Sequence, residues 1–332
     1  MSTGLDFVTV IIKNLPRGVL KFIVRRLGFG VLTLLIVSFI IFGATQLLPS
    51  DAAQTQLGRN ATPASVAKLR VELGLNKPKV EQYTTWLKGI VTGDPGKSLV
   101  GSKLPVLDGM GARVTNSLFL LILATIVSVP ISLWLGAYMA RRTAPVLSNA
   151  MLALASLPEF VIGVVLVIIF ATRLWHLLPA VSAIDIGKGP WTDPKGAILP
   201  TITLALGAIP YISRTARASL SEVLQSDYVE MARLKGLHER QVMRRHAFPN
   251  ALGPVFQVIA LNVAYFAAGV IIVETVFNFP GVGGAMSTAV KARDIPTIQF
   301  LAMVLAAVYI ITNIAADVAT ILVTPRLRTR LQ

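Results

Sequence analysis

Apolar runs long enough to cross a membrane recur along this chain, separated by polar segments. They are expected at about 27–48, 115–140, 146–173, 198 through 210, 254–277 and 297–322. A helix needs about 20 mostly apolar residues to cross a hydrocarbon core about 30 Å thick. Pro130, Pro158 and Pro210 lie inside three of the runs and predict kinks. The pattern predicts an all-α polytopic membrane protein with six transmembrane helices.

A hydrophilic stretch over 49–112 separates the first two apolar runs. Helices are predicted within it over 63–73, ended by Gly74, and over 80–91. The second helix would place four apolar side chains on one face, at positions i, i+3, i+4 and i+7: Tyr83, Trp86, Leu87 and Ile90. Because such a face needs a surface to pack against, the stretch is predicted to be a small folded cap.

The same pattern divides the chain into five parts. They are an N-terminal extension over 1–20, a first transmembrane helix over 21–48, the cap over 49–112, a transmembrane core over 113–325 and a tail over 326–332. The first apolar run is not followed by a small-residue cleavage site, so we expect a permanent span and not a cleaved signal.

The net charge of +15 indicates the orientation of the chain in the membrane. Basic residues gather before the first run, at Arg141-Arg142 and in a polar segment over about 213–253. Short cytoplasmic loops of membrane proteins carry an excess of Lys and Arg. We therefore expect both termini and the 213–253 segment in the cytoplasm and the cap outside. The basic clusters flank apolar runs and lack a nucleic-acid motif, so nucleic-acid binding is not expected.

Composition removes several kinds of chemistry. The chain has no cysteine, which excludes disulfides, thiol catalysis and Cys-ligated metals. It has only three histidines, His176, His238 and His246, which argues against a His-rich metal site. Gly96-Lys97-Ser98 resembles the end of a phosphate-binding loop, but Val91 stands where that loop requires glycine. We therefore expect no nucleotide site, no metal and no cofactor in this chain.

The polar segment 213–253 has its own pattern of helix signals. Asp227 is predicted to cap a short helix, and Gly236 is predicted to end it in a left-handed turn. A second short helix is expected over 238–247, with Pro249 and Pro254 stopping it before the next apolar run. Judged from the residues alone, the segment is equally compatible with a lever that receives a partner's movement and with an ordinary amphipathic loop helix.

This segment resembles the cytoplasmic loop of ABC-importer permeases, whose pattern is Glu-Ala-Ala, three residues, Gly, nine residues, Ile, any residue and Leu-Pro. The matching residues are Glu230, Ala232, Gly236 and Pro249, and the departures are Met231, His246 and Phe248. The departures are similar to the peptide/nickel subfamily, which is matched by Tyr228, Val229, Ala232, Arg233, Lys235, Gly236, Leu237, Arg245, His246, Ala247, Asn250, Ala251 and Pro254.

The resemblance extends from about residue 20 onward. It includes Arg25-Arg26-Leu27, Leu48-Pro49-Ser50-Asp51, Gly93-Asp94-Pro95-Gly96-Lys97-Ser98, Val273 to Phe277, Pro280 to Gly283, Asp317 and Pro325-Arg326. It implies the type I ABC-importer permease fold, similar to the oligopeptide or dipeptide permease B subunit. The first 20 residues are outside the resemblance and take no role from it.

The resemblance also implies function and partners. The chain would pair with a homologous permease subunit in a bacterial or archaeal inner membrane and conduct a peptide or similar small solute. Two ATPase subunits, which hold the ATP and Mg, would dock on the cytoplasmic side, and a binding protein would deliver cargo from outside. The residues expected to couple the chain to the ATPases are Tyr228, Glu230, Ala232, Arg233, Lys235, Gly236 and Leu237.

Three acidic residues lie within apolar runs: Glu159, Glu274 and Asp317. A charge facing lipid at mid-membrane costs about 2.5–3.5 kcal/mol on insertion scales, so such residues are expected to face the protein interior or a water-filled path. Each is a candidate for contact with a cationic group of the cargo, and each is also compatible with a structural role.

Two other classes of function remain as alternatives. An intramembrane enzyme would need a catalytic motif, and neither HExxH nor Gly-x-Ser-x-Gly is present. A self-sufficient secondary transporter or channel would need a complete pathway in one chain, often built from inverted repeats. No internal repeat is visible. The sequence therefore favours a permease subunit without its own enzymatic activity.

Overall fold

The computed structural model describes residues 17–47, 52–57, 61–72, 74–99, 104–173, 176–185 and 187–323. Most of the predicted extension and the whole predicted tail lie outside these residues. Within them the regular elements are helical, apart from an isolated β-bridge between Lys97 and Pro105. The α-helices are α2 (Arg17–Gln46), α3 (Ala52–Leu57), α4 (Pro63–Glu72), α5 (Lys79–Thr92), α6 (Met110–Arg141), α7 (Pro145–Ser156), α8 (Glu159–Val167), α9 (Ile198–Leu224), α10 (Asp227–Leu234), α11 (Glu239–Gln241), α12 (Phe248–Val276), α13 (Val282–Ala292) and α14 (Ile295–Val323).

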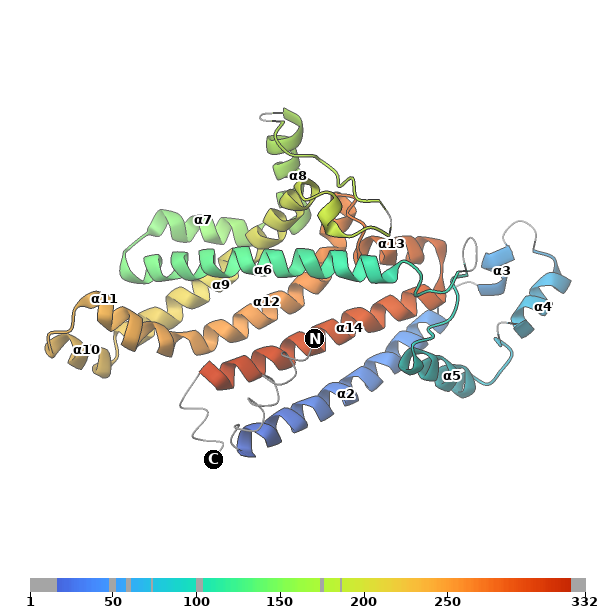
Figure 1. Ribbon diagram of the computed structural model, residues 1–332, viewed down its shortest axis with the longest axis horizontal. Coiled ribbons are helices and arrows are strands. Elements are labelled where there is room, and N and C mark those ends of the chain that lie inside the picture. The colour runs from blue at the N-terminus through green and yellow to red at the C-terminus, as the bar shows by residue number, and fades with distance from the viewer. Residues whose placement is uncertain are drawn as a thin grey trace.

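Long helices lying side by side form the body of the molecule (Figure 1). Among the described residues, four helices are long and apolar enough to cross a membrane, at Lys21–Gln46, Met110–Arg141, Lys195–Leu224 and Ile295–Ala315. A bent helix pair gives a fifth candidate if it counts as one span. The predicted all-α membrane architecture is thus confirmed at the level of four or five apolar spans.

The interior is built around α9, which is the most buried of these four helices. Along α6 every fourth residue is buried, from Asn116 through Ala124 and Ser132 to Gly136, so one stripe of the helix faces inward. A Cβ at Gly136 would lie 2.6 Å from the Cβ of Ala216 and 2.8 Å from the carbonyl oxygen of Ser213. Small residues therefore let α6 and α9 approach closely, as they do in many membrane helix pairs.

The third predicted span is two helices and not one kinked helix. α7 and the segment Glu159–Thr172 are bent against each other by 103°. Leu157 and Pro158 both have extended backbone conformations at the break. Proline lacks a backbone N–H and disfavours the helical conformation of the residue before it, so the chain leaves the helix at Leu157 and starts a new one at Glu159. The last turns, η2 (Ile168–Arg173), are π-helical.

The predicted apolar face of the second cap helix packs against the first long helix. Tyr83 of α5 makes edge contacts with Phe39 and Phe42 of α2, and Trp86 stacks obliquely on Phe42. The Tyr83 hydroxyl lies 2.9 Å from the hydroxyl of Ser38, within hydrogen-bonding distance. The apolar face of α5, which was predicted from residue spacing alone, thus packs against α2.

A buried carboxylate joins the end of the cap to the last long helix. Asp294, just before α14, accepts hydrogen bonds from the Ser98 hydroxyl at 2.5 Å, the Leu99 N–H at 2.9 Å and the Thr297 hydroxyl at 2.7 Å. The segment that resembles a phosphate-binding loop is therefore a turn held against α14, and the Ser98 hydroxyl is hydrogen-bonded to Asp294.

The predicted helix stop at Pro249 and Pro254 was wrong. α9 continues past residue 213 to Leu224, and the chain is helical without a break from Glu239 through η5 (Val242–Ala247) to Val276. Pro249 does not stop the helix, because it lies where the π-helical η5 passes into α12, and a wider π-helical turn accommodates the missing N–H. Pro254 lies inside α12. Two long helices consequently lead directly into the polar segment, which lies at the opposite end of the bundle from α3, α4 and α5 (Figure 1).

Candidate functional site

The short helix α10 connects the ends of α9 and the helical run into α12 (Figure 1). Asp227 was predicted as its N-cap, but the residue with the extended capping backbone is Ser226. The Ser226 hydroxyl donates to the carbonyl of Val223 at 2.5 Å and makes no capping bond. Asp227 instead lies in the first turn together with Glu230, where carboxylates are stabilised by the positive end of the helix dipole.

The end of α10 confirms the predicted left-handed turn at Gly236, which has φ +77°. The Gly236 N–H donates to the carbonyl of Arg233 at 2.9 Å, and the Leu237 N–H donates to that of Ala232 at 3.3 Å. These two bonds define a Schellman motif, which satisfies carbonyls that the helix end would leave unpaired. Glycine is suited to this position because a side chain disfavours positive φ.

The inner face of α10 fixes its place. Val229 and Ala232, three residues apart and therefore on one side of the helix, are buried against Val242 of η5. Val223, Leu224 and Leu237 pack around this cluster. α10 thus contacts both the last turn of α9 and the start of the run into α12, so a force on α10 would act on both long helices.

The outer face of α10 presents large apolar side chains to solvent. Tyr228, Met231 and Leu234 are 38%, 53% and 74% exposed and follow one another at intervals of three residues. Glu230 and Lys235 are exposed beside them. A hollow of about 600 Å³ lies next to this face, lined by Leu224, Gln225, Glu230, Arg233 and Leu234. Apolar residues surrounded by charges and beside a hollow are typical of a protein docking site.

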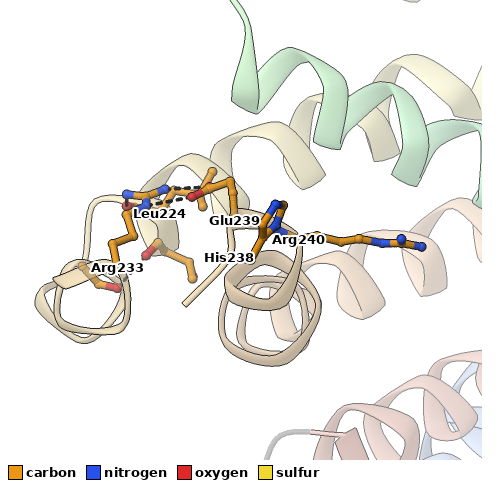
Figure 2. Close-up of polar contacts among 7 residues, drawn as sticks. Leu224, Arg233, His238, Glu239 and Arg240 are labelled. Carbon is orange, nitrogen blue, oxygen red and sulfur yellow. Dashed lines mark hydrogen bonds and ion pairs between the residues drawn. The ribbon is translucent and has the colours of Figure 1, made fainter. Parts of the chain in front are cut away.

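Arg233 and Glu239 form a fork across the turn at Gly236 (Figure 2). The Arg233 Nε and Nη2 atoms donate to the two carboxylate oxygens of Glu239 at 3.1 and 3.0 Å, and Nη1 donates to the carbonyl of Leu224 at 3.4 Å. The hydrogen bond from Arg233 lowers the pKa of Glu239, and the same bond raises the pKa of Arg233. The fork therefore ties α10 to both α9 and α11.

Sequence reasoning identified Arg233 but missed Glu239. The two residues are six positions apart, which is outside the i, i+3 and i, i+4 distances at which side chains meet on one helix. They meet because the chain turns back at Gly236. An arginine and a glutamate on either side of a helix-ending glycine are the one signal in the sequence that points to the contact.

Glu274 is fully buried and its carboxylate joins three helices. It accepts hydrogen bonds from the Ser117 hydroxyl of α6, from the Gly283 N–H at 2.6 Å and from the Gly284 N–H at 3.2 Å. A carboxylate at the first N–H groups of α13 is stabilised by that helix end. These bonds give Glu274 a structural function, while its contact with cargo remains a prediction.

Asp317 lies in α14 and forms an ion pair with Arg26 of α2, with 3.0 Å between Arg26 Nη1 and Asp317 Oδ2. Both side chains are partly exposed. The pair links the first and last long helices of the described chain. As for Glu274, a pathway role of Asp317 remains a prediction.

Glu159 differs from the other two acidic residues. It follows the break at Pro158 as the first residue of α8 and is only 8% exposed. Its Oε1 atom is buried and has no hydrogen-bond partner among the described residues. The three predicted pathway residues therefore differ in their contacts. Glu274 is hydrogen-bonded and Asp317 is in an ion pair, whereas Glu159 has a buried oxygen without a hydrogen-bond partner among the described residues.

The described chain is thus a bundle of apolar helices in which one short helix is held between the ends of two long ones. Residues 128–329 match the family described as binding-protein-dependent transport system inner membrane component. Residues 19–132 match the corresponding N-terminal family of these membrane components. The chain belongs to this family and is a permease subunit of an ABC importer.

Individual relatives cover nearly the whole chain. A probable peptide ABC transporter permease protein of Sinorhizobium fredii is 35% identical over 92% of this chain and 99% of its own length. The glutathione transport system permease protein of Pectobacterium atrosepticum is 34% identical over 93% of this chain and 99% of its own length. Among solved structures, the crystal structure of an amino acid ABC transporter with histidines covers 66% of this chain and 94% of that chain, with a TM-score of 0.47 and 17% identity.

Proposed function

We propose that this permease subunit forms, with a homologous partner, the pathway of an inner-membrane importer for peptides or similar small solutes, and that two separate ATPase subunits drive it through α10. The observation that carries the proposal is the construction of α10. Its inner face packs on α9 and on the run into α12, while its outer face presents apolar and charged side chains to solvent.

In this proposal the chain crosses the membrane six times. The spans are α2, α6, the bent pair α7 and α8, α9, α12 and α14. α12 is included because its 29 residues carry one charged side chain, Glu274, and extend about 43 Å at 1.5 Å per residue. The parts of the chain are then the extension 1–20, the first helix 21–48, the cap 49–112, the core 113–325 and the tail 326–332.

The orientation follows from charge and from the two ends of the bundle. Arg141 and Arg142, together with the arginines around α10, support a cytoplasmic location for that end of the bundle. The α3–α5 cap lies at the other end of the bundle and would face outside, where a binding protein delivers cargo (Figure 1). Both chain termini would be cytoplasmic.

The coupling residues divide into two groups by their surroundings. Tyr228, Glu230 and Lys235 are exposed and would contact the ATPase. Ala232, Arg233, Gly236 and Leu237 hold α10 in place through packing, the fork and the Schellman motif. A movement of the ATPase would push α10 and tilt α9 and α12 together. Catalysis and ATP binding would belong to the partner, and this chain would hold no cofactor.

The cargo class is drawn from the relatives, one of which is described as a peptide permease and one as a glutathione permease. A peptide or a small peptide-like solute fits both. Since the binding protein selects cargo in such systems, the permease sequence points to this class and not to one compound.

Two measurements test the proposal. Because the chain has no cysteine, Lys235→Cys and Lys88→Cys each create a unique thiol at an exposed position. A membrane-impermeant maleimide should label Lys88→Cys in intact cells and Lys235→Cys only after the cytoplasmic side is opened. Labelling of Lys235→Cys from outside would contradict the orientation.

The second measurement separates the importer from a self-sufficient transporter. Proteoliposomes holding the chain with its partner permease, ATPases and binding protein should accumulate a labelled peptide only with ATP and Mg²⁺. Proteoliposomes with this chain alone should not accumulate it under an ion gradient. Uptake by the chain alone would favour the secondary transporter.

A further inference from the structure

We propose that Glu159, together with Tyr211 and Tyr265, forms a site for a protonated amine of the cargo on the pathway side of this subunit. The inference rests on the proposed function, because it assumes that the open face of this subunit lines the pathway. It adds the chemistry of the passing solute, which is a primary ammonium such as the amino terminus of a peptide.

The first observation is the state of the carboxylate. Glu159 is more than nine-tenths buried, and its Oε1 atom lacks a hydrogen-bond partner within the described chain. A buried carboxylate is normally satisfied by N–H or O–H donors or by a cation, because burial without them is costly. Glu274 shows the satisfied arrangement in the same protein, with donors from Ser117 and α13. The Oε1 atom of Glu159 is thus a hydrogen-bond acceptor that could be satisfied by a donor from outside this chain.

The second observation is the space around the carboxylate. A Cβ at Gly269 of α12 would lie 2.3 Å from Oε2, and a Cβ at Gly207 of α9 would lie 3.1 Å from Oε1. Helix backbone therefore closes on the carboxylate from two sides. Both glycines lie inside helices, where their N–H groups bond within the helix and do not compensate the charge. A side chain at Gly269 would displace the carboxylate.

The third observation is the aromatic face beside it. Tyr211 of α9 and Tyr265 of α12 are 48% and 55% exposed. Each lies one helical turn from a glycine that closes on the carboxylate, Tyr211 four residues after Gly207 and Tyr265 four residues before Gly269. The Tyr211 hydroxyl donates to the carbonyl of Ala155 in α7 at 3.3 Å, which orients the ring near the bend. Aromatic faces attract cations, and a carboxylate next to them favours ammonium over neutral or anionic groups.

The fourth observation is depth. Gly269 lies seven residues before the end of α12 and Gly207 nine residues after the start of α9, which corresponds to about 10 and 14 Å along the helices. The carboxylate is therefore well inside the span. Intramembrane carboxylates generally face a bundle interior or a water-filled path and pair with a cation there. A passing ammonium would supply the missing partner.

The test uses the complete transporter in proteoliposomes with ATP and a labelled tripeptide that has a free amino terminus. Glu159→Gln keeps the shape of the side chain and removes its charge. We expect it to lower kcat/KM for uptake at least tenfold, as for loss of a charged hydrogen bond, with an unchanged midpoint of thermal unfolding. Glu159→Asp should restore part of the uptake, and the same change at an exposed cap residue, Glu81→Gln, should stay within twofold of wild type.

A labelling experiment measures access to position 159 directly, because the chain has no cysteine of its own. The thiol of Glu159→Cys should react with a small cationic methanethiosulfonate during ATP turnover, and the tripeptide should slow the reaction at least threefold. Mass spectrometry assigns the modified position when partner subunits contain cysteine.

Three results would overturn the inference. They are wild-type uptake by Glu159→Gln, loss of its uptake only in proportion to loss of folded protein, and a Glu159→Cys thiol that stays unreactive during turnover. A failure of the proposed function looks different, since the wild-type transporter itself would then not take up the tripeptide.

Discussion

The sharpest prediction concerns Gly236, where a single backbone conformation ends α10, the helix proposed to couple this chain to the ATPases. In Gly236→Val the new Cβ would meet no atom within 4 Å, so crowding at Cβ does not contribute. The cost comes from φ +77°, a conformation that L-residues adopt at about 1–2 kcal/mol. This free energy corresponds to a factor of about 5–30 in the equilibrium constant for forming the Schellman turn.

The expected result is a protein that inserts and assembles but couples poorly. Without the turn, Leu237 leaves the cluster around Val229, and Arg233 no longer faces Glu239. In proteoliposomes with the ATPases, peptide uptake per ATP hydrolysed should fall, at most by about 5- to 30-fold, as for a turn destabilised by about 1–2 kcal/mol. Both rates are measured on the same vesicles, and the amount of inserted protein is measured by immunoblot.

Two control variants separate this cause from general damage. Gly236→Asn should lose less, because asparagine tolerates the left-handed conformation better than valine. Gly28→Ala changes a glycine of α2 that also has open space around it but lies in an ordinary helical conformation, so coupling should not change. Wild-type coupling in Gly236→Val, or equal losses in Gly28→Ala, would refute the reasoning.

Two further predictions concern ion pairs. Asp317→Asn should lower stability by less than about 1 kcal/mol in thermal unfolding, because its pair with Arg26 is partly exposed, and should leave uptake within twofold. A large loss of uptake at unchanged stability would instead favour a pathway role for Asp317. The Arg233–Glu239 pair should add up to about 1 kcal/mol at neutral pH. Because the pKa of Glu239 is lowered in the folded state, this contribution should be complete above the ordinary pKa of glutamate and should be lost as the pH falls from there through the lower folded-state pKa. Hydrogen exchange of α10 amides at pH 7 and pH 4 measures the change, and Glu239→Gln should show no such pH dependence.

Much of the fold was predictable because a membrane span is determined by residues that are close together in the sequence. Burial in lipid requires a run of apolar residues and a backbone that satisfies its own hydrogen bonds, and a single helix meets both needs. The same applies to the α5 face, since Tyr83 and Trp86 fall on one side by helical spacing alone. The turn at Gly236 was predictable because few residues other than glycine suit positive φ.

Other features depend on contacts between distant segments. Pro158 predicted a kink in the third span. The angle of 103° between the two helices depends on how α7 and α8 pack on α9. Pro249 and Pro254 signalled a stop, yet the chain stays helical through both. The sequence marked Glu159, Glu274 and Asp317 as equivalent candidates, and the structure distinguishes them by their donors and partners.

The chain's own residues thus determined its class: an apolar helical bundle for a membrane, with one charged segment that resembles an ATPase-coupling loop. Tertiary structure decided how that segment is held and which embedded carboxylate lacks a partner. The physical reason is the distance along the sequence over which each feature is determined. Hydropathy, helix ends and turns depend on neighbours within a few residues, whereas the Arg233–Glu239 fork and the surroundings of Glu159 exist only where separate helices meet.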